Sequence, residues 1–185
     1  MLIIVAEKKS ESYENKAIYF AEGLVKRKFE VTLFNLSDYC RENIKFIKSK
    51  KVKNRIYLDD KENISVDYLK EKIKELKKTK KLNVIIMDMR DKGIQGDYEK
   101  LSKELKEIPE NIGVIMLLNI KENIKDNMVD VENIENQLIT INADMIYATT
   151  KNENKEKQTY IIKSNNPKFP VGLLKKQKKF SAFLH

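Results

Sequence analysis

The sequence predicts an α/β fold in which a mostly parallel β-sheet carries helices on both faces. Two observations favour this fold. Short apolar runs such as Leu2–Val5 and Val84–Met87 indicate buried strands. Segments whose apolar residues recur at helical spacing separate these runs, and this alternation is typical of parallel sheets. The length of 185 residues suits one domain. We expect residues 1–180 to form that domain and residues 181–185 to form a C-terminal tail.

The expected elements follow from these patterns in chain order. Ala17–Val25, Val66–Leu76 and Tyr98–Ile108 each place their apolar residues on one helical face, and Ser65 can cap the second helix. The last two apolar runs predict strands in a hairpin-like C-terminal part. The predicted strands are Leu2–Val5, Val31–Leu36, Arg55–Leu58, Val84–Met87, Val114–Leu118, Ala143–Tyr147 and Tyr160–Ile162.

Composition excludes several classes of protein. No run of about 18 apolar residues could span a membrane, and the N-terminus lacks the basic region and cleavage site of a signal peptide. The single cysteine, Cys40, rules out an intramolecular disulfide and suits a reducing cytoplasm. With His185 as the only histidine, a Cys/His zinc site is excluded. We therefore expect a cytoplasmic protein without a metal.

The net charge of +9 is concentrated in two blocks. Residues 41–55 hold seven basic residues against Glu42, and residues 151–185 hold nine lysines against two acids. Such blocks could contact a phosphate backbone, or they could be a lysine-rich surface that only aids solubility. The candidate nucleic-acid contacts are Lys48, Lys50, Lys51, Lys53, Lys175, Lys176, Lys178 and Lys179.

The turn after the first strand is the expected ligand site of such a sheet. A phosphate-binding loop needs glycines there, with a lysine and a Ser or Thr, but the first of the five glycines is Gly23. The segment Ala6–Glu14 instead carries three acids, which disfavour a bound phosphate: Glu7, Glu11 and Glu14. Asp88 ends another strand, where an acid could hold magnesium-bound water or simply cap a helix.

Several segments together resemble the C-terminal, RecA-like ATPase domain of DnaB-type replicative helicases. Leu2–Ala6 resembles the first strand of that family and Leu82–Asp88 its Walker B strand, and the order and spacing of the segments agree over nearly the whole chain. The resemblance implies a P-loop NTPase fold. The other matching segments are Val31–Leu36, Ile56–Asp60, Ile112–Asn119, Ala143–Ile146 and Ile161–Asn166.

The departures from the family fall on its working residues. Only Asp88 and Lys163 keep family identities. Lys163 could contact a phosphate or an acid of a partner, or it could be solvated. In the phosphate loop, Glu7 and Ser12 replace a small residue and a glycine, Tyr13 the lysine, and Glu14 the Ser/Thr. Elsewhere, Ser37 replaces the catalytic glutamate, Asn119 the glutamine that senses the γ-phosphate, and Asn165 the arginine finger.

These departures predict a pseudo-ATPase that lacks the ATP and magnesium of the family. The leading hypothesis is a non-catalytic, DnaB-helicase-like protein linked to DNA replication or mobile elements. It would act by binding a replicative helicase, another replication protein or nucleic acid. The alternatives are a DnaB-type helicase or ATPase subunit with altered nucleotide binding, and a remnant domain without a molecular role. We expect the N-terminal domain and the linker helix of the family to be absent.

Overall fold

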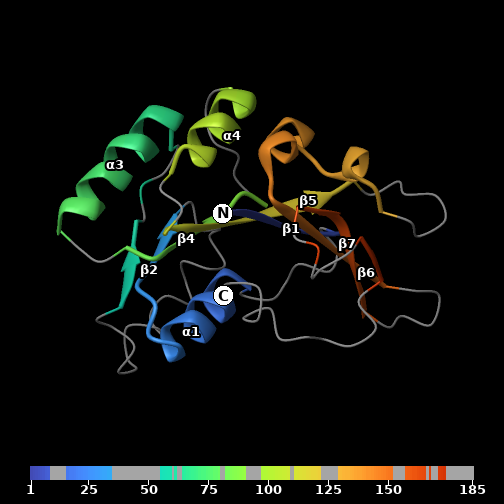
Figure 1. Ribbon diagram of the computed structural model, residues 1–185, viewed down its shortest axis with the longest axis horizontal. Coiled ribbons are helices and arrows are strands. Elements are labelled where there is room, and N and C mark those ends of the chain that lie inside the picture. The colour runs from blue at the N-terminus through green and yellow to red at the C-terminus, as the bar shows by residue number, and fades with distance from the viewer. Residues whose placement is uncertain are drawn as a thin grey trace.

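The computed structural model of the protein contains one eight-stranded sheet in the order β3-β2-β4-β5-β1-β6-β7-β8 (Figure 1). The neighbours from β3 to β6 pair in parallel, whereas β7 and β8 pair antiparallel. This confirms the predicted fold class and the hairpin-like C-terminal part. The structure describes residues 1–8, 16–34, 55–59, 61, 64–79, 82–90, 97–108, 111–121, 129–151, 157–165, 167 and 171–173.

Helices cover both faces of this sheet, as predicted. One helix, α1 (Lys16–Lys26), packs on one face, and α3 (Val66–Thr79) and α4 (Tyr98–Lys106) pack on the other (Figure 1). None of the described helices is long and apolar enough to cross a membrane. The strands are β1 (Leu2–Lys8), β2 (Val31–Phe34), β3 (Ile56–Leu58), β4 (Val84–Asp88), β5 (Gly113–Ile120), β6 (Met145–Lys151), β7 (Lys157–Ser164) and β8 (Gly172–Leu173).

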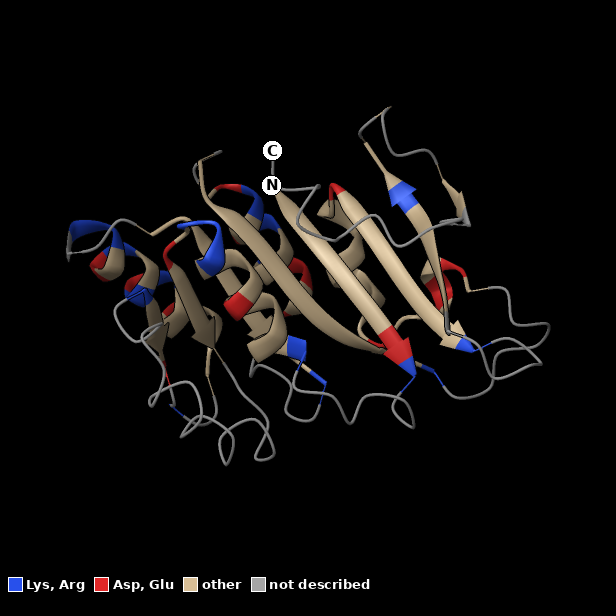
Figure 2. Ribbon diagram, turned by 90° about the horizontal axis from the view of Figure 1, so that it is seen from below, with Lys and Arg blue, Asp and Glu red and all other residues tan. Residues whose placement is uncertain are grey.

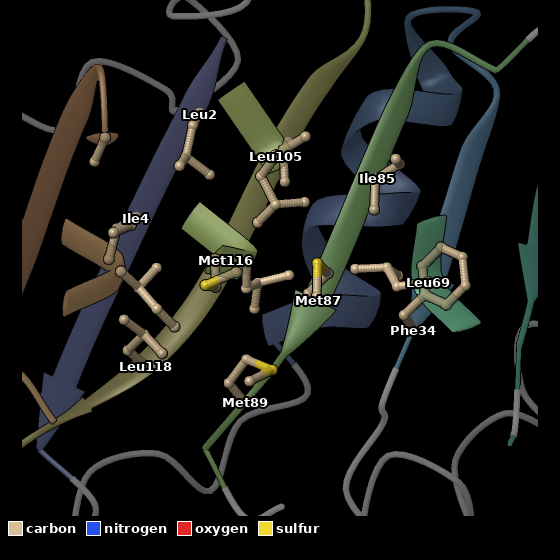
Figure 3. Packing of buried hydrophobic residues seen from close by; sticks show 14 of the residues in the cluster. Leu2, Ile4, Phe34, Leu69, Ile85, Met87, Met89, Leu105, Met116 and Leu118 are labelled. Atoms are coloured by element: carbon tan, nitrogen blue, oxygen red, sulfur yellow. The ribbon is translucent and has the colours of Figure 1, made fainter. Parts of the chain in front are cut away.

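Strand alternation divides the core into two layers. On β1, Leu2 and Ile4 face α3 and α4, and Ile3 and Val5 face α1. Figure 3 shows the first layer, where Met87 and Met116 of neighbouring strands lie close to Leu69 of α3 and Leu105 of α4. The central strands are buried on both faces, which explains their continuous apolar runs.

A capping side chain precedes each of the two helices of this layer. The Oγ of Ser65 accepts a hydrogen bond from the Tyr68 N–H at 3.2 Å, which confirms the predicted cap of α3. The Asp97 side chain accepts bonds from the N–H groups of Glu99 and Lys100 at the start of α4. The helix ends at Lys106, so Ile108 lies beyond it while still packing against the core.

Several elements differ from the sequence prediction, since β6 and β7 are also longer than expected. First, β1 continues to Lys8, three residues past the predicted end, because β5 and β6 flank it and pair with it on both sides. Glu7 is therefore a strand residue, paired with Asn119 of β5 and Thr149 of β6. Second, two short 3₁₀ helices, η3 (Val131–Asn133) and η4 (Gln137–Asn142), precede β6. Ala143 consequently lies between η4 and β6 rather than in the strand.

Candidate functional site

Three polar side chains meet where the central strands end. Glu7 is paired in register with Asn119 of β5, and Asp88, the last residue of β4, is paired with Leu117 of β5. By strand alternation, Glu7, Asp88 and Asn119 all lie on the sheet face that carries α1. Figure 2 shows β1 uncharged along its length and charged only at its carboxyl end. This is the strand edge where ligands bind in open α/β sheets.

A guanidinium group links the two acids of this site. The Arg90 Nε and Nη2 donate to Asp88 Oδ1 and Oδ2 at 2.9 and 2.8 Å, which is a two-pronged contact. The Nη1 of Arg90 donates to Glu7 Oε1 at 2.5 Å. The ammonium group of Lys16, the first residue of α1, pairs with Glu7 Oε2. Each of the four carboxylate oxygens therefore faces a cationic donor.

The site is buried and electrically balanced. Glu7, Asp88 and Arg90 are 2, 1 and 7% exposed. Two carboxylates and two cations, with Lys16 included, give a local charge of zero. An unpaired charge would be costly at such burial. The pairing therefore allows four ionised groups to lie together at the ends of the strands. We name this cluster of Glu7, Lys16, Asp88 and Arg90 the ionic lock.

Asn119 extends the ionic lock through its amide. Its Nδ2 donates to the Arg90 carbonyl at 2.6 Å and to Glu135 Oε2 at 3.2 Å. The contact with the Arg90 carbonyl fixes the backbone that presents the guanidinium. Within the described part of the chain, the buried Asn119 Oδ1 has no hydrogen-bond partner.

The two acids of the ionic lock are engaged by cations of the chain itself rather than arranged as magnesium ligands. Mg²⁺ prefers carboxylate oxygens and water as ligands, and the Asp88 and Glu7 oxygens already accept hydrogen bonds from Arg90 and Lys16. No group of three or more Cys, His, Asp or Glu side chains suited to a metal occurs among the residues that the structure describes.

The placement of Glu7 corrects one sequence expectation. We expected Glu7 to belong to an acidic turn, where it would disfavour a phosphate by repulsion. Instead it is a strand residue whose charge Arg90 and Lys16 compensate. The other proposed replacements of the phosphate loop and the second strand lie outside the described residues: Ser12, Tyr13, Glu14 and Ser37. The same holds for Lys48, Lys50, Lys51, Lys53, Lys175, Lys176, Lys178 and Lys179.

The segment that resembles the arginine-finger region lies on β7. Lys163 is half-buried, and its Nζ donates to the carbonyls of Thr140 and Ile141 in η4 at 3.0 and 2.8 Å, so it is not the solvated lysine of one expectation. Burial, and then repulsion from Lys106, holds the pKa of Lys163 below its usual value. Asn165 is exposed, and its backbone N–H donates to the Asp144 carbonyl at 2.9 Å.

Asp144 connects this end of the sheet to the start of β1. Its Oδ2 accepts from the Leu2 N–H at 2.8 Å, and its Oδ1 pairs with Lys106 at 2.8 Å. Burial alone would raise the pKa of Asp144, but the hydrogen bonds from Lys106 and Leu2 outweigh it and lower that pKa. This carboxylate is thus held in its charged form as a structural clamp.

A second buried acid follows β3. Asp59 is 5% exposed and accepts hydrogen bonds from the Tyr68 hydroxyl at 2.7 Å and from the Lys61 N–H at 3.2 Å. Burial, together with the bond to Asp59, raises the pKa of Tyr68 to about 12. These contacts connect the end of β3 to α3, so the buried Asp59 has a structural role.

Sequence reasoning missed Arg90 and Lys16. The available signal was the position of Arg90, two residues after an acid that ends a buried strand. A buried carboxylate requires a partner, and a cation at that spacing can fold back onto it. Lys16 carried no such signal, because only the fold brings the start of α1 beside Glu7.

Comparison with solved structures identifies related folds. The chain matches a structure described as an ATPase domain with a TM-score of 0.66 and 15% identity, over 94% of this chain and 79% of that one. It also matches a DnaB-like replicative helicase, from a structure that describes its interactions with primase, with a TM-score of 0.68 and 15% identity. That match covers 94% of this chain but only 54% of the helicase chain.

These matches show that the chain has the RecA-like fold found in DnaB-like helicase ATPase domains. At 15% identity the likeness extends to the fold alone. No protein-family model matches the sequence. No curated protein matches it either.

Proposed function

We propose that this protein is a non-catalytic, DnaB-helicase-like protein linked to DNA replication or mobile elements, which acts by contact with a helicase, another replication protein or nucleic acid. The observation that carries this proposal is the ionic lock. Arg90 and Lys16 engage all four carboxylate oxygens at the strand edge where a helicase ATPase would hold its magnesium and phosphates.

The cost of opening the ionic lock argues against nucleotide binding. A magnesium ion would have to displace Arg90 from Asp88, and removing one partner of a buried ion pair costs about 3–5 kcal/mol. An approaching phosphate would also meet two acids that the sequence places after β1, Glu11 and Glu14. The absence of glycine before Gly23 adds to this cost, because backbone N–H groups cannot form the usual phosphate cradle.

The β7 segment supports the same conclusion. An arginine finger must reach the nucleotide of a neighbouring subunit, and such a residue contributes about 10³–10⁵ in rate. Here Asn165 stands at that place, and Lys163 is engaged by the carbonyl groups of its own η4. Neither side chain is arranged to complete the active site of a neighbour.

The retained fold favours contact as the mode of action. One of the matched structures describes a DnaB-like helicase and its interactions with primase, which favours a replication protein as the partner. The lysine blocks at residues 45–53 and 175–179 offer nucleic acid as a second partner. We therefore place a replication protein first and nucleic acid second among its partners.

The decisive experiment measures nucleotide binding and turnover together. Calorimetric titration with ATP and Mg²⁺ should show no binding tighter than about millimolar. Phosphate release should stay at background with and without single-stranded DNA. A helicase-type ATPase subunit with altered nucleotide binding is the competing function, because Asp88 is retained at its strand end. Micromolar binding or DNA-stimulated turnover would establish that function instead.

A further inference from the structure

The outer face of α1 exposes an aromatic ring. Tyr19 is 75% exposed, more than any other large hydrophobic side chain in the described part of the chain. The ring of Phe20 lies 6.3 Å away, centroid to centroid, at an interplanar angle of 58°, which is a tilted aromatic contact. Phe20 is itself half-buried and packs against the core. The ring of Tyr19 is therefore supported by its neighbour while most of its surface stays open to solvent.

Gly23 keeps this ring uncovered. It lies four residues after Tyr19, inside α1, and a Cβ placed on it would meet nothing within 4 Å. The fold therefore gives no steric reason for a glycine, although glycine is among the least favourable residues inside a helix. A long side chain at this position would lie back over the preceding turn, where Tyr19 is. Its absence leaves open space beside the ring.

The end of α1 shows the reverse choice of residue. Lys28 follows the helix with a left-handed backbone (φ 72°), a conformation that favours glycine, yet the residue is a lysine. Neither Lys28 nor Lys26 forms an ion pair within the described part of the chain. Gly23 and Lys28 thus each have a local cost that no contact of the described residues offsets. Such departures from local preference are expected at functional positions.

The charge beside the ring is positive. Residues 22–28 contain three cations and one acid, Glu22, which is half-buried. Arg55 adds a guanidinium group, whose Nη1 donates to the Lys28 carbonyl at 2.6 Å and whose Nε lies 3.7 Å from Glu30. Four cations and two acids leave a net charge of +2. An open aromatic ring beside cations is the combination that binds single strands, because the ring stacks on a base and the cations contact phosphates.

We propose that the outer face of α1 binds single-stranded nucleic acid. A base stacks on Tyr19 in the space that Gly23 leaves open, and the adjoining phosphates contact Lys26 and Lys28. We name these four residues the α1 face. Among the described helices, α1 lies alone on its side of the sheet, so this surface is separate from α3 and α4 (Figure 1). The inference rests on the proposed contact with nucleic acid and assigns it a surface other than the lysine blocks.

Fluorescence anisotropy on the full chain tests this surface. The probes are labelled oligo-dT, oligo-rU and an abasic strand of the same length, at about 50 and about 200 mM salt. Tyr19→Ala should weaken the binding of strands with bases by about 5- to 150-fold and leave the abasic strand unaffected, because only stacking is lost. Tyr19→Phe, which keeps a ring, should bind like the unchanged protein. A difference between oligo-dT and oligo-rU identifies the preferred nucleic acid.

Two further variants separate binding from stability. Gly23→Gln and Lys28→Gly remove the two local costs, so each should raise the melting temperature, by about 2–4 °C for Gly23→Gln. Each should nevertheless weaken binding. The glutamine covers the ring of Tyr19, and the loss of Lys28 removes a phosphate contact together with about one unit of the salt slope. Gly23→Ala is the matched control, because its short side chain should stabilise the helix and leave binding intact.

The control for location is Ile141→Ala. Ile141 is 56% exposed on η4, on the opposite face of the sheet, so its loss should not change binding. The proposal is overturned if neither oligo-dT nor oligo-rU binds at the lower salt concentration, if Tyr19→Ala binds them as tightly as the unchanged protein, or if Gly23→Gln binds normally. The α1 face would then be left to a protein partner. None of these results bears on the proposed loss of ATPase activity, which only nucleotide binding or turnover would contradict.

Discussion

Replacing Arg90 by methionine should destabilise the protein severely. The side chain is 5% exposed, and its loss removes three charge-assisted hydrogen bonds to Asp88 and Glu7 while leaving both carboxylates buried. Breaking a buried ion pair in this way costs about 3–5 kcal/mol. For a chain of this size, each kcal/mol lowers the melting temperature by about 2–4 °C. We therefore expect a loss of roughly 6–20 °C at pH 7.5.

The charge of the carboxylates, rather than the lost packing, should cause most of this effect. Replacing the acids as well, in Glu7→Gln/Asp88→Asn/Arg90→Met, should recover part of the stability at pH 7.5, because no unpaired charge then remains.

Arg55→Met is the matched control. Arg55 is 42% exposed and pairs with Glu30 at 3.7 Å, so its loss should cost less than about 1 kcal/mol. Thermal and urea unfolding followed by circular dichroism compare the variants. Equal losses in Arg90→Met and Arg55→Met, or a triple variant no more stable than Arg90→Met, would refute the view that the ionic lock compensates buried charge.

Three further outcomes follow from the structure and the sequence. Asp144→Asn should cost about 1–2 kcal/mol at pH 7. Because the pKa of Asp144 is lowered in the fold, this contribution is full above the ordinary carboxyl range and is lost as the pH falls through the lowered pKa. The urea midpoints of the two proteins should therefore converge at acidic pH. Lys163→Met should speed amide hydrogen exchange in η4, whose carbonyls it binds, whereas Lys151→Met should not. Replacing Lys48, Lys50, Lys51 and Lys53 by glutamine should weaken binding to single-stranded DNA, measured by fluorescence anisotropy. The dependence of the logarithm of the binding constant on the logarithm of salt concentration should become shallower by about one unit per lost phosphate contact. Unchanged binding would mean that these lysines form only a solvated surface.

The alternation of strands and helices could be predicted because it follows from local patterns. The buried run Val84–Asp88 and the Ser65 cap of α3 are examples in which neighbouring residues contain the whole signal. The end of β1 could not be predicted in this way. Glu7 is a strand residue because two neighbouring strands, distant in sequence, pair with it. The helices η3 and η4 were missed because runs this short have no clear apolar period.

The candidate site shows the same division. Its location at the strand ends follows from the order of the elements, and Asp88 marks it in the sequence. Its chemistry depends on contacts across 83 residues, between Arg90 and Glu7, which no local pattern contains. The sequence therefore indicated repulsion between three acids and a phosphate, whereas the structure shows that Glu7, the acid of the three that it describes, is already compensated.

The ionic lock also explains how such a strand edge can be stable without a ligand. In a parallel sheet the carboxyl ends of the central strands converge, and acids placed there must be compensated by bound cations or by the chain itself. Arg90 provides this compensation from the residue pair that follows β4, and its carbonyl is held in turn by Asn119 of β5. Lys16 provides the rest from the first turn of α1. Because these contacts join β1, β4, β5 and α1, the residues that compensate the buried charge also fix the central strands and α1 together.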